Sequence, residues 1–192
     1  WNQWRSDNPF IWPDLKRADL RELDLAGADL NRANLLLANL SDTNLQAAVL
    51  PWADLRAADL CWADLRRANL SLAHLKRAKL CWADLTEATL YETDLRRTDL
   101  SSADLRLANL TRANLAGANF DEAICETSLF ADVDLSEVQG LETITHAGPS
   151  TIGLDTIAKS NGKISEAFLR GCGVSQKYIT HLAALWNNSN LR

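Results

Sequence analysis

The chain of 192 residues contains no methionine, few aromatic residues and no long apolar run. A natural reading frame begins with methionine, so a chain that starts at Trp1 and has none is expected to be a piece of a longer or processed protein. Aromatic residues make up 7% of the chain while hydrophobic residues make up 47%, so leucine and alanine supply most of the apolar mass. No run reaches the ~18 apolar residues that a membrane-spanning helix needs, and no signal peptide is visible.

The sequence also lacks an excess of basic residues and any familiar cysteine pattern. The formal net charge is -5, which argues against a general nucleic-acid binder, since such proteins are basic. Four cysteines stand at positions 61, 81, 125 and 172, and they follow neither a disulfide-framework nor a zinc-finger spacing. Reduced thiols in a cytoplasmic protein are therefore the expectation.

A five-residue repeat dominates the chain. The stretch CWADL occurs at residues 61–65 and again at 81–85. Every fifth residue from Leu15 to Leu115 is leucine, and Phe120 makes this a series of 22 positions without a break. The residue two places earlier is usually alanine, and Asp or Asn stands between them, so the unit is A-(D/N)-L-x-x.

The period of five fits neither a helix nor a long strand. A helix needs apolar residues about 3.6 positions apart, and a strand needs a period of two. Within one unit, alanine and leucine are two residues apart and face the same side, whereas Asp or Asn faces the other. The two remaining positions suit a corner. The recurrence of CWADL after 20 residues predicts coils of four units, stacked about 4.8 Å apart.

These repeats resemble the pentapeptide repeat family. The resemblance implies an all-β solenoid, a right-handed four-sided parallel β-helix, over residues 13–140. The opening WNQWRSDNPF is similar to the lead-in of that family, and residues 1–12 are expected to form a capping segment, because solenoid ends need caps. The alanine partner is replaced by Ser128 and Val133 as the repeat decays, and Gly140 ends its frame.

Residues 141–192 differ in composition and are expected to form a small α-helical cap or connector. Capping residues and apolar spacing predict helices over about 151–160, 165–170 and 175–187. The words GPSTIGLDTI and EAFLRGCGV resemble a connector that precedes a TIR domain in bacterial pentapeptide repeat proteins. The resemblance implies a covalently linked TIR-type domain in the full-length chain, and no NAD-cleaving activity is assigned to these residues.

Trp62 and Trp82 are the leading candidates for partner binding. They occupy the same corner in adjacent coils and should face water, and exposed tryptophans are enriched at interfaces. The alternative is that both lie flat on their own wall or under a capping segment. Neighbouring coils would bring Cys61 and Cys81 into disulfide range, but laddered side chains point in parallel, so we expect no disulfide.

Charged columns run along the outside of the predicted coils. Asp64, Asp84 and Asp104 form an unbroken acidic column and complete the candidate partner surface. A cluster of basic residues shares another corner, where charge balance is expected over phosphate binding: Arg56, Lys76, Arg77, Arg96 and Arg97. No nucleophile beside a base, phosphate loop or metal-ligand cluster is visible, so we assign no catalytic, cofactor-binding or metal site.

Two functions compete at this point. The first is a non-enzymatic scaffold or protein-interaction module within a larger bacterial signalling protein, with a protein partner of unknown identity and no contact with nucleic acid or membrane. The second is a DNA mimic that binds DNA gyrase or topoisomerase, as some pentapeptide repeat proteins do. Eleven outward aspartates between Asp14 and Asp104 favour mimicry, but residues 1–140 carry 22 acidic and 15 basic side chains, a net charge of only -7.

Overall fold

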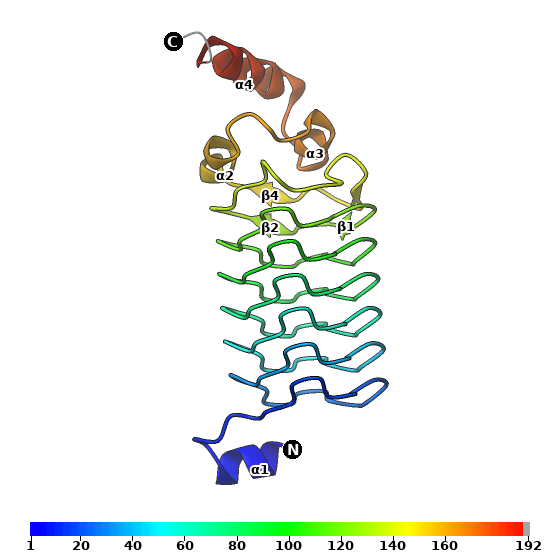
Figure 1. The fold of residues 1–192 in the computed structure, drawn as a ribbon. Helices are drawn as coiled ribbons and strands as arrows, with labels where there is room; N and C mark the ends of the chain where they lie inside the picture. The colour runs from blue at the N-terminus through cyan, green and yellow to red at the C-terminus, as the bar shows by residue number, and fades with distance from the viewer. Residues whose placement is uncertain (190–192) are drawn as a thin grey trace.

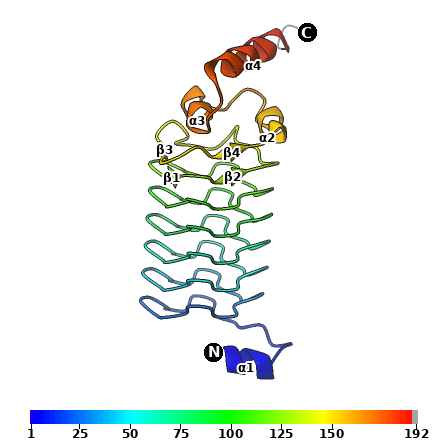
Figure 2. The same cartoon turned by 180° about the vertical axis from the view of Figure 1, so that it is seen from behind.

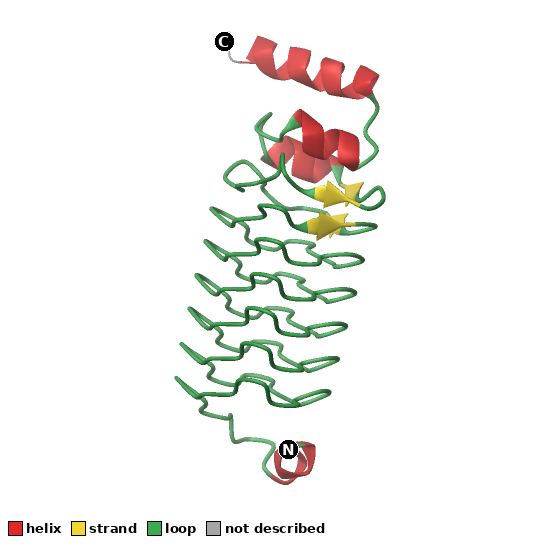
Figure 3. Cartoon of the chain, turned by 90° about the vertical axis from the view of Figure 1, so that its right-hand side faces the viewer, coloured by secondary structure: helices red, strands yellow, loops and turns green. Residues whose placement is uncertain are grey.

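The protein, seen in a computed structural model that describes residues 1–189, is a rod of stacked coils with helices at both ends (Figure 1). The elements, in chain order, are α1 (Asn2–Asp7), β1 (Ile124–Cys125), β2 (Leu129–Phe130), β3 (Thr145–His146), β4 (Thr151–Ile152), α2 (Leu154–Lys159), α3 (Glu166–Gly171) and α4 (Gln176–Ser189). Most of the rod is drawn as loop, because each wall of a coil holds only an isolated bridge residue (Figure 3).

Parallel bridges between residues twenty positions apart hold the coils together. Asp54 bridges His74, and His74 bridges Asp94, with the same spacing repeated along the rod. The Leu55 N–H donates to the His74 carbonyl at 2.8 Å, and the His74 N–H donates to the Ala53 carbonyl at 2.9 Å. The coil therefore takes twenty residues, which is four of the five-residue units.

Each corner is a tight turn whose second residue adopts a left-handed backbone. At one corner the Ala63 N–H donates to the Leu60 carbonyl at 3.1 Å, and Trp62 between them has a φ of 66°. This combination is typical of a type II turn, which favours glycine at that position. Most coils here use other residues, although a left-handed non-glycine residue costs of order 1–2 kcal/mol. The ladder of backbone hydrogen bonds fixes the corners despite this cost.

Leucine and alanine fill the axis of the rod. Nearly all repeat leucines from Leu30 to Leu115 are completely buried, and the alanines two places earlier are buried beside them. Four hydroxyl residues take alanine positions in the core, and each hydroxyl donates at 2.8 Å to a carbonyl 23 residues earlier: Thr43, Thr93, Thr98 and Ser128. Buried polar groups are tolerated only when they are paired in this way.

The N-terminal helix α1 supplies hydrogen bonds that a further coil would have made. The Asp29 N–H donates to the Asn2 side-chain oxygen at 2.9 Å, and the Asn2 amide donates to the Gly27 carbonyl at 2.9 Å. Within the stack, the Val49 N–H donates instead to the carbonyl of Ala28, 21 residues earlier. One asparagine side chain thus satisfies part of the open edge, which would otherwise present unpaired backbone groups.

At the other end, the pairing continues past Gly140. Strand β3 pairs in parallel with β1, and β4 pairs in parallel with β2, so two more wall segments lie on the last coil (Figure 2). The hydroxyl of Ser160 then accepts the Leu135 N–H at 3.0 Å, where a further coil would have offered a carbonyl. The three predicted helices are confirmed as α2, α3 and α4, with bounds shifted by a few residues.

An aromatic side chain from α3 covers the end of the core. Phe168 is fully buried and meets Phe130 edge to face, with ring centroids 5.3 Å apart. His146 lies beside it at 5.4 Å, and both ring nitrogens of His146 are buried without a hydrogen-bond partner among the described residues. Burial lowers the pKa of His146 below its ordinary value, since the charged ring is disfavoured there.

The core can be tested with two leucines of one coil. Leu105 is fully buried in a wall, and Leu107 is 50% exposed at the adjoining corner. We expect Leu105→Ala to lower the free energy of unfolding by about 3 kcal/mol, because it leaves a cavity among close-packed side chains. The matched variant Leu107→Ala should change it by less than about 1 kcal/mol. Urea unfolding followed by circular dichroism measures both, and equal effects would contradict the assignment of the core.

The partly buried His146, with both ring nitrogens enclosed, predicts a pH dependence of stability. Because the folded pKa of His146 is lowered, the unfolded chain binds the extra proton below its ordinary pKa of about 6.5, and stability should fall as pH falls through that range. The variant His146→Leu should lose this part of the dependence between pH 7.5 and 5.5. His181→Gln, on the exposed face of α4, is the control. Unfolding midpoints that fall equally in wild type and His146→Leu would refute the prediction.

Candidate interaction surface

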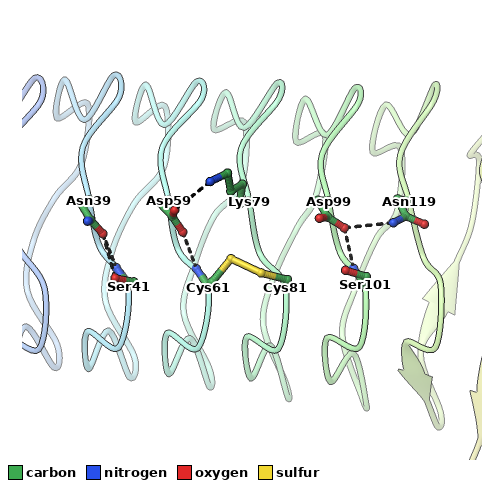
Figure 4. Close-up of a disulfide and its surroundings, with 9 residues drawn as sticks. All are labelled: Asn39, Ser41, Asp59, Cys61, Lys79, Cys81, Asp99, Ser101 and Asn119. Atoms are coloured by element: carbon green, nitrogen blue, oxygen red, sulfur yellow. Dashed lines mark hydrogen bonds and ion pairs between the residues drawn. A yellow bond between two sulfur atoms is a disulfide. The ribbon is translucent and has the colours of Figure 1, made fainter.

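One corner of the rod carries a disulfide between adjacent coils. Cys61 and Cys81 are bonded through their sulfur atoms, and their Cα atoms lie 4.7 Å apart (Figure 4). The prediction that these cysteines stay reduced and unpaired is therefore wrong. In-register stacking makes the two Cα–Cβ bonds parallel, but rotation about each of those bonds still lets the sulfur atoms turn toward each other. Coil spacing places the pair within the Cα range that a disulfide accepts.

Trp62 and Trp82 follow the two cysteines and stack on each other. Their ring centroids are 5.0 Å apart, and their planes differ by 3°. The side chains are 57% and 51% exposed, so the expectation that they face water is confirmed. The backbone of each is fixed by the ladder, with the Trp62 N–H donating to the Cys81 carbonyl at 3.0 Å. The result is a flat aromatic surface of two indoles whose positions are set before any partner arrives.

Hydrogen bonds on the adjoining wall hold the same corner. The Asp59 carboxylate accepts the Cys61 N–H at 3.2 Å and the Lys79 ammonium from the next coil at 3.2 Å (Figure 4). Two coils on from Asp59, Asp99 accepts the Ser101 N–H at 3.1 Å and the Asn119 amide at 3.1 Å. An outward aspartate therefore fixes the start of the corner and links neighbouring coils as well.

The acidic column on the wall after the corner is largely neutralised. Asp64, Asp84 and Asp104 are brought together by consecutive bridges, as predicted. The Arg66 guanidinium binds Asp64, with Nε 2.8 Å from Oδ1, and lies 3.7 Å from Asp84. Arg106 binds Asp104 in the same manner, with Nη2 2.6 Å from Oδ2. Each arginine stands two residues after its aspartate, which lets it fold back onto the wall.

These contacts set the ionisation of the column. The hydrogen bond from the Arg66 side chain holds the pKa of Asp64 below its usual value. Partial burial raises the pKa of Asp104, but the hydrogen bonds and charge of Arg106 outweigh it, so that the net pKa is lowered. Asp64 and Asp104 are therefore ionised carboxylates that carry their own counter-ions, and they offer a partner polar contacts more than free negative charge.

The other cysteines and acidic residues form no second site in the described part of the chain. Cys125 and Cys172 are free and buried, and burial raises the pKa of each thiol to about 12, so neither is a nucleophile at neutral pH. Among the described residues, no three His, Cys, Asp or Glu side chains come together as metal ligands would. No helix in that same part is long and apolar enough to span a bilayer.

The repeat pattern matches a known family. A family model described as pentapeptide repeats matches in eight copies, over residues 14–51, 36–71, 53–90, 73–112 and 108–139. Because these matches cover more than half of the chain, the chain belongs to the pentapeptide repeat family. Proteins of this family form right-handed β-helices, and the match describes a repeat and indicates no enzyme. No curated protein matches the chain.

Solved structures of pentapeptide repeat proteins and of one resistance protein are similar to this chain. A pentapeptide repeat protein from the Arabidopsis thaliana thylakoid lumen is 22% identical, with a TM-score of 0.50 over 62% of this chain and 86% of that one. The pentapeptide repeat protein Rfr23 from the cyanobacterium Cyanothece 51142 is 26% identical, with a TM-score of 0.39 over 65% and 92%. QnrB1, a plasmid-mediated fluoroquinolone resistance protein, is 15% identical, with a TM-score of 0.28 over 76% and 82%. Only the first of these likenesses bears on the fold, and it concerns the fold alone.

The disulfide can be tested directly by alkylation and by unfolding. The folded, unreduced protein should have no thiol that reacts with iodoacetamide, and reduction without unfolding should expose two, at positions 61 and 81. Replacing both with alanine should lower the free energy of unfolding by about 3 kcal/mol, because the bond closes a loop of about twenty residues. Ser101→Ala at the same corner is the control. Rapid alkylation at positions 61 and 81 before reduction would disprove the bond.

Proposed function

We propose that this protein is a rigid, non-enzymatic protein-interaction module. Its partner contacts the Trp62–Trp82 corner and the adjoining acidic column of Asp64, Asp84 and Asp104. The observation that carries the proposal is the pair of stacked, half-exposed indoles, 5.0 Å apart. The backbone ladder ties the coils at this corner to one another, so the rod presents this surface on a fixed frame.

The energetics of association favour such a surface. Binding normally costs freedom of side chains at the interface, roughly 0.5–1.5 kcal/mol for each immobilised one. Here the disulfide beside the indoles and the backbone ladder have already fixed their attachment points. Tryptophan is among the residues that dominate interface energies, because it buries a large area with few rotatable bonds. A partner that covers both rings gains apolar burial with little ordering cost.

The alternative proposal, a mimic of DNA that binds DNA gyrase, has less support. A mimic needs an acidic face, and the candidate column is paired with Arg66 and Arg106. Elsewhere, Asp54 and Asp94 are paired in the same manner with Arg56 and Arg96. Inhibition of gyrase supercoiling at micromolar protein would bring this alternative back.

We infer a four-sided coil and a connecting role for the tail. Bridges recur every twenty residues and each unit has one corner, so one unit forms each side. Residues 141–189 continue from the last coil into α4, which lies at the far end of the rod (Figure 1). Together with its resemblance to a connector, this supports a link to a TIR-type signalling domain in a longer bacterial protein. An immunoblot of the native protein near 21 kDa would reject that link.

The cytoplasmic location predicted from the sequence stays a proposal, and the disulfide bears on it. Disulfides persist in oxidising compartments and are uncommon in the cytosol. A protein that acts in the cytoplasm would hold Cys61 and Cys81 reduced for part of its life. The backbone ladder at this corner does not depend on the bond, so the fold accommodates both states.

The proposal predicts which tryptophans a partner needs. The double variant Trp62→Ser, Trp82→Ser should weaken binding of a purified partner by about 2 kcal/mol or more per ring, as interface hot spots do. Trp52→Ser is the matched control, because Trp52 is 49% exposed at the same position of another corner. The partner is first identified by crosslinking in source cells, and its affinity is then measured by calorimetry. Equal affinity of wild type and the double variant would reject this surface.

A further inference from the structure

The basic corner of the rod is only partly neutralised. It consists of five cations on three successive coils: Arg56, Lys76, Arg77, Arg96 and Arg97. Arg56 binds the Asp54 carboxylate with Nε 2.7 Å from Oδ1, and Arg96 binds Asp94 at 2.8 Å in the same manner. The expectation of a charge-balanced corner is therefore met for these two cations and for no others.

Three cations at this corner have no counter-ion in the part of the chain that the structure describes. Among residues whose side chains the structure describes, no carboxylate lies within ion-pair distance of Lys76, Arg77 or Arg97. Lys76 and Arg77 are consecutive on one coil, and Arg97 stands directly above Arg77 on the next. Like charges at the spacing of adjacent coils repel each other, so a bound anion would relieve repulsion within this cluster.

A hollow of about 460 Å³ opens beside these cations. It is lined by Lys76, Arg96, Arg97, Ala116, Gly117, Glu137 and Gln139. Gly117 creates the space, because the same corner position holds a side chain in neighbouring coils, namely Arg97 below and Glu137 above. A Cβ at Gly117 would meet Cγ of Arg97 at 3.4 Å, so the stem of Arg97 runs along the floor of the hollow.

We propose that this hollow binds the phosphate group of a small ligand. Lys76 and Arg97 supply uncompensated positive charge, and Arg97 offers a guanidinium fork that matches phosphate oxygens. Gln139 adds an amide donor at the rim. The volume falls within the range of small-molecule sites, about 300–1,000 Å³. Glu137 is the one carboxylate lining the hollow, and it limits the affinity for anions.

The site is tested by titrating the folded, ¹⁵N-labelled protein at constant ionic strength. Orthophosphate, pyrophosphate and adenosine monophosphate are the probes, and a short DNA duplex is a fourth arm. Saturable shifts of the Gly117 and Gln139 amides with any of the first three support the site, and their relative affinities distinguish a bare phosphate from a nucleotide. Shifts with the duplex alone, or shifts that do not saturate, overturn it.

Charge variants at this hollow should change the phosphate affinity in opposite directions, which variants of purely structural residues would not do. Arg97→Gln and Lys76→Gln should each weaken phosphate binding about tenfold, which is about 1.4 kcal/mol. Glu137→Gln should strengthen it severalfold, because it removes the opposing charge. Arg56→Gln is the control at the same corner, since Arg56 is paired with Asp54 outside the hollow. Binding that is unchanged in Arg97→Gln, or weakened equally in Arg56→Gln, refutes the proposal.

Discussion

Backbone hydrogen bonds between residues about twenty positions apart are the interaction on which the rest of this protein depends. They place identical positions of the repeat above one another, so a residue chosen in one coil acquires neighbours in the coils above and below. The stacked indoles, the disulfide, the aspartate column and the basic corner all follow from that register. A shift of five residues would move each of them to a different corner.

The ladder also makes possible a backbone that would be unfavourable in isolation. Corner after corner places a non-glycine residue in the left-handed region, each at a cost of order 1–2 kcal/mol. In return, the corner brings leucine and alanine into a core that excludes water almost completely. Because the second corner residue is free of packing, it can be Trp62 at one site and Arg97 or Gly117 at another. The fold is set mainly by the two inward positions of each unit, and the surface by the outward position and the two corner positions.

Much of the fold could be predicted from the sequence, because the same five-residue pattern repeats along the chain. One unit shows little, but twenty-two in register specify the core, the corner and the coil length. The stacking of Trp62 on Trp82 followed from the same twenty-residue interval. What could not be predicted depends on torsions and on single contacts. Predicting the disulfide requires the directions in which the Cys61 and Cys81 sulfur atoms turn. Predicting the hydrogen bonds that Asn2 makes to the open edge requires the position of α1.

The prediction of ion pairs from the sequence meets the same limit. The sequence places arginines and aspartates on neighbouring columns, but it does not show which cations fold back onto carboxylates. Arg96 binds Asp94, while its neighbour Arg97 runs over Gly117 and stays unpaired. That difference of one residue separates a neutral wall from a candidate anion site. It arises because Arg96 stands two residues after an aspartate, whereas the residues twenty positions either side of Arg97 are Arg77 and Gly117, which offer no carboxylate.

The most direct test of the account moves the disulfide along its column. In a Cys61→Ser background, Ser101→Cys places a thiol twenty residues after Cys81, one coil further along the same corner, whereas Arg96→Cys places it fifteen residues away, at a different corner. Mass spectrometry after mild oxidation of the folded proteins counts the bonded cysteines. The account predicts a bond between positions 81 and 101 and none between positions 81 and 96. A bond in both variants, or in neither, would contradict the twenty-residue register.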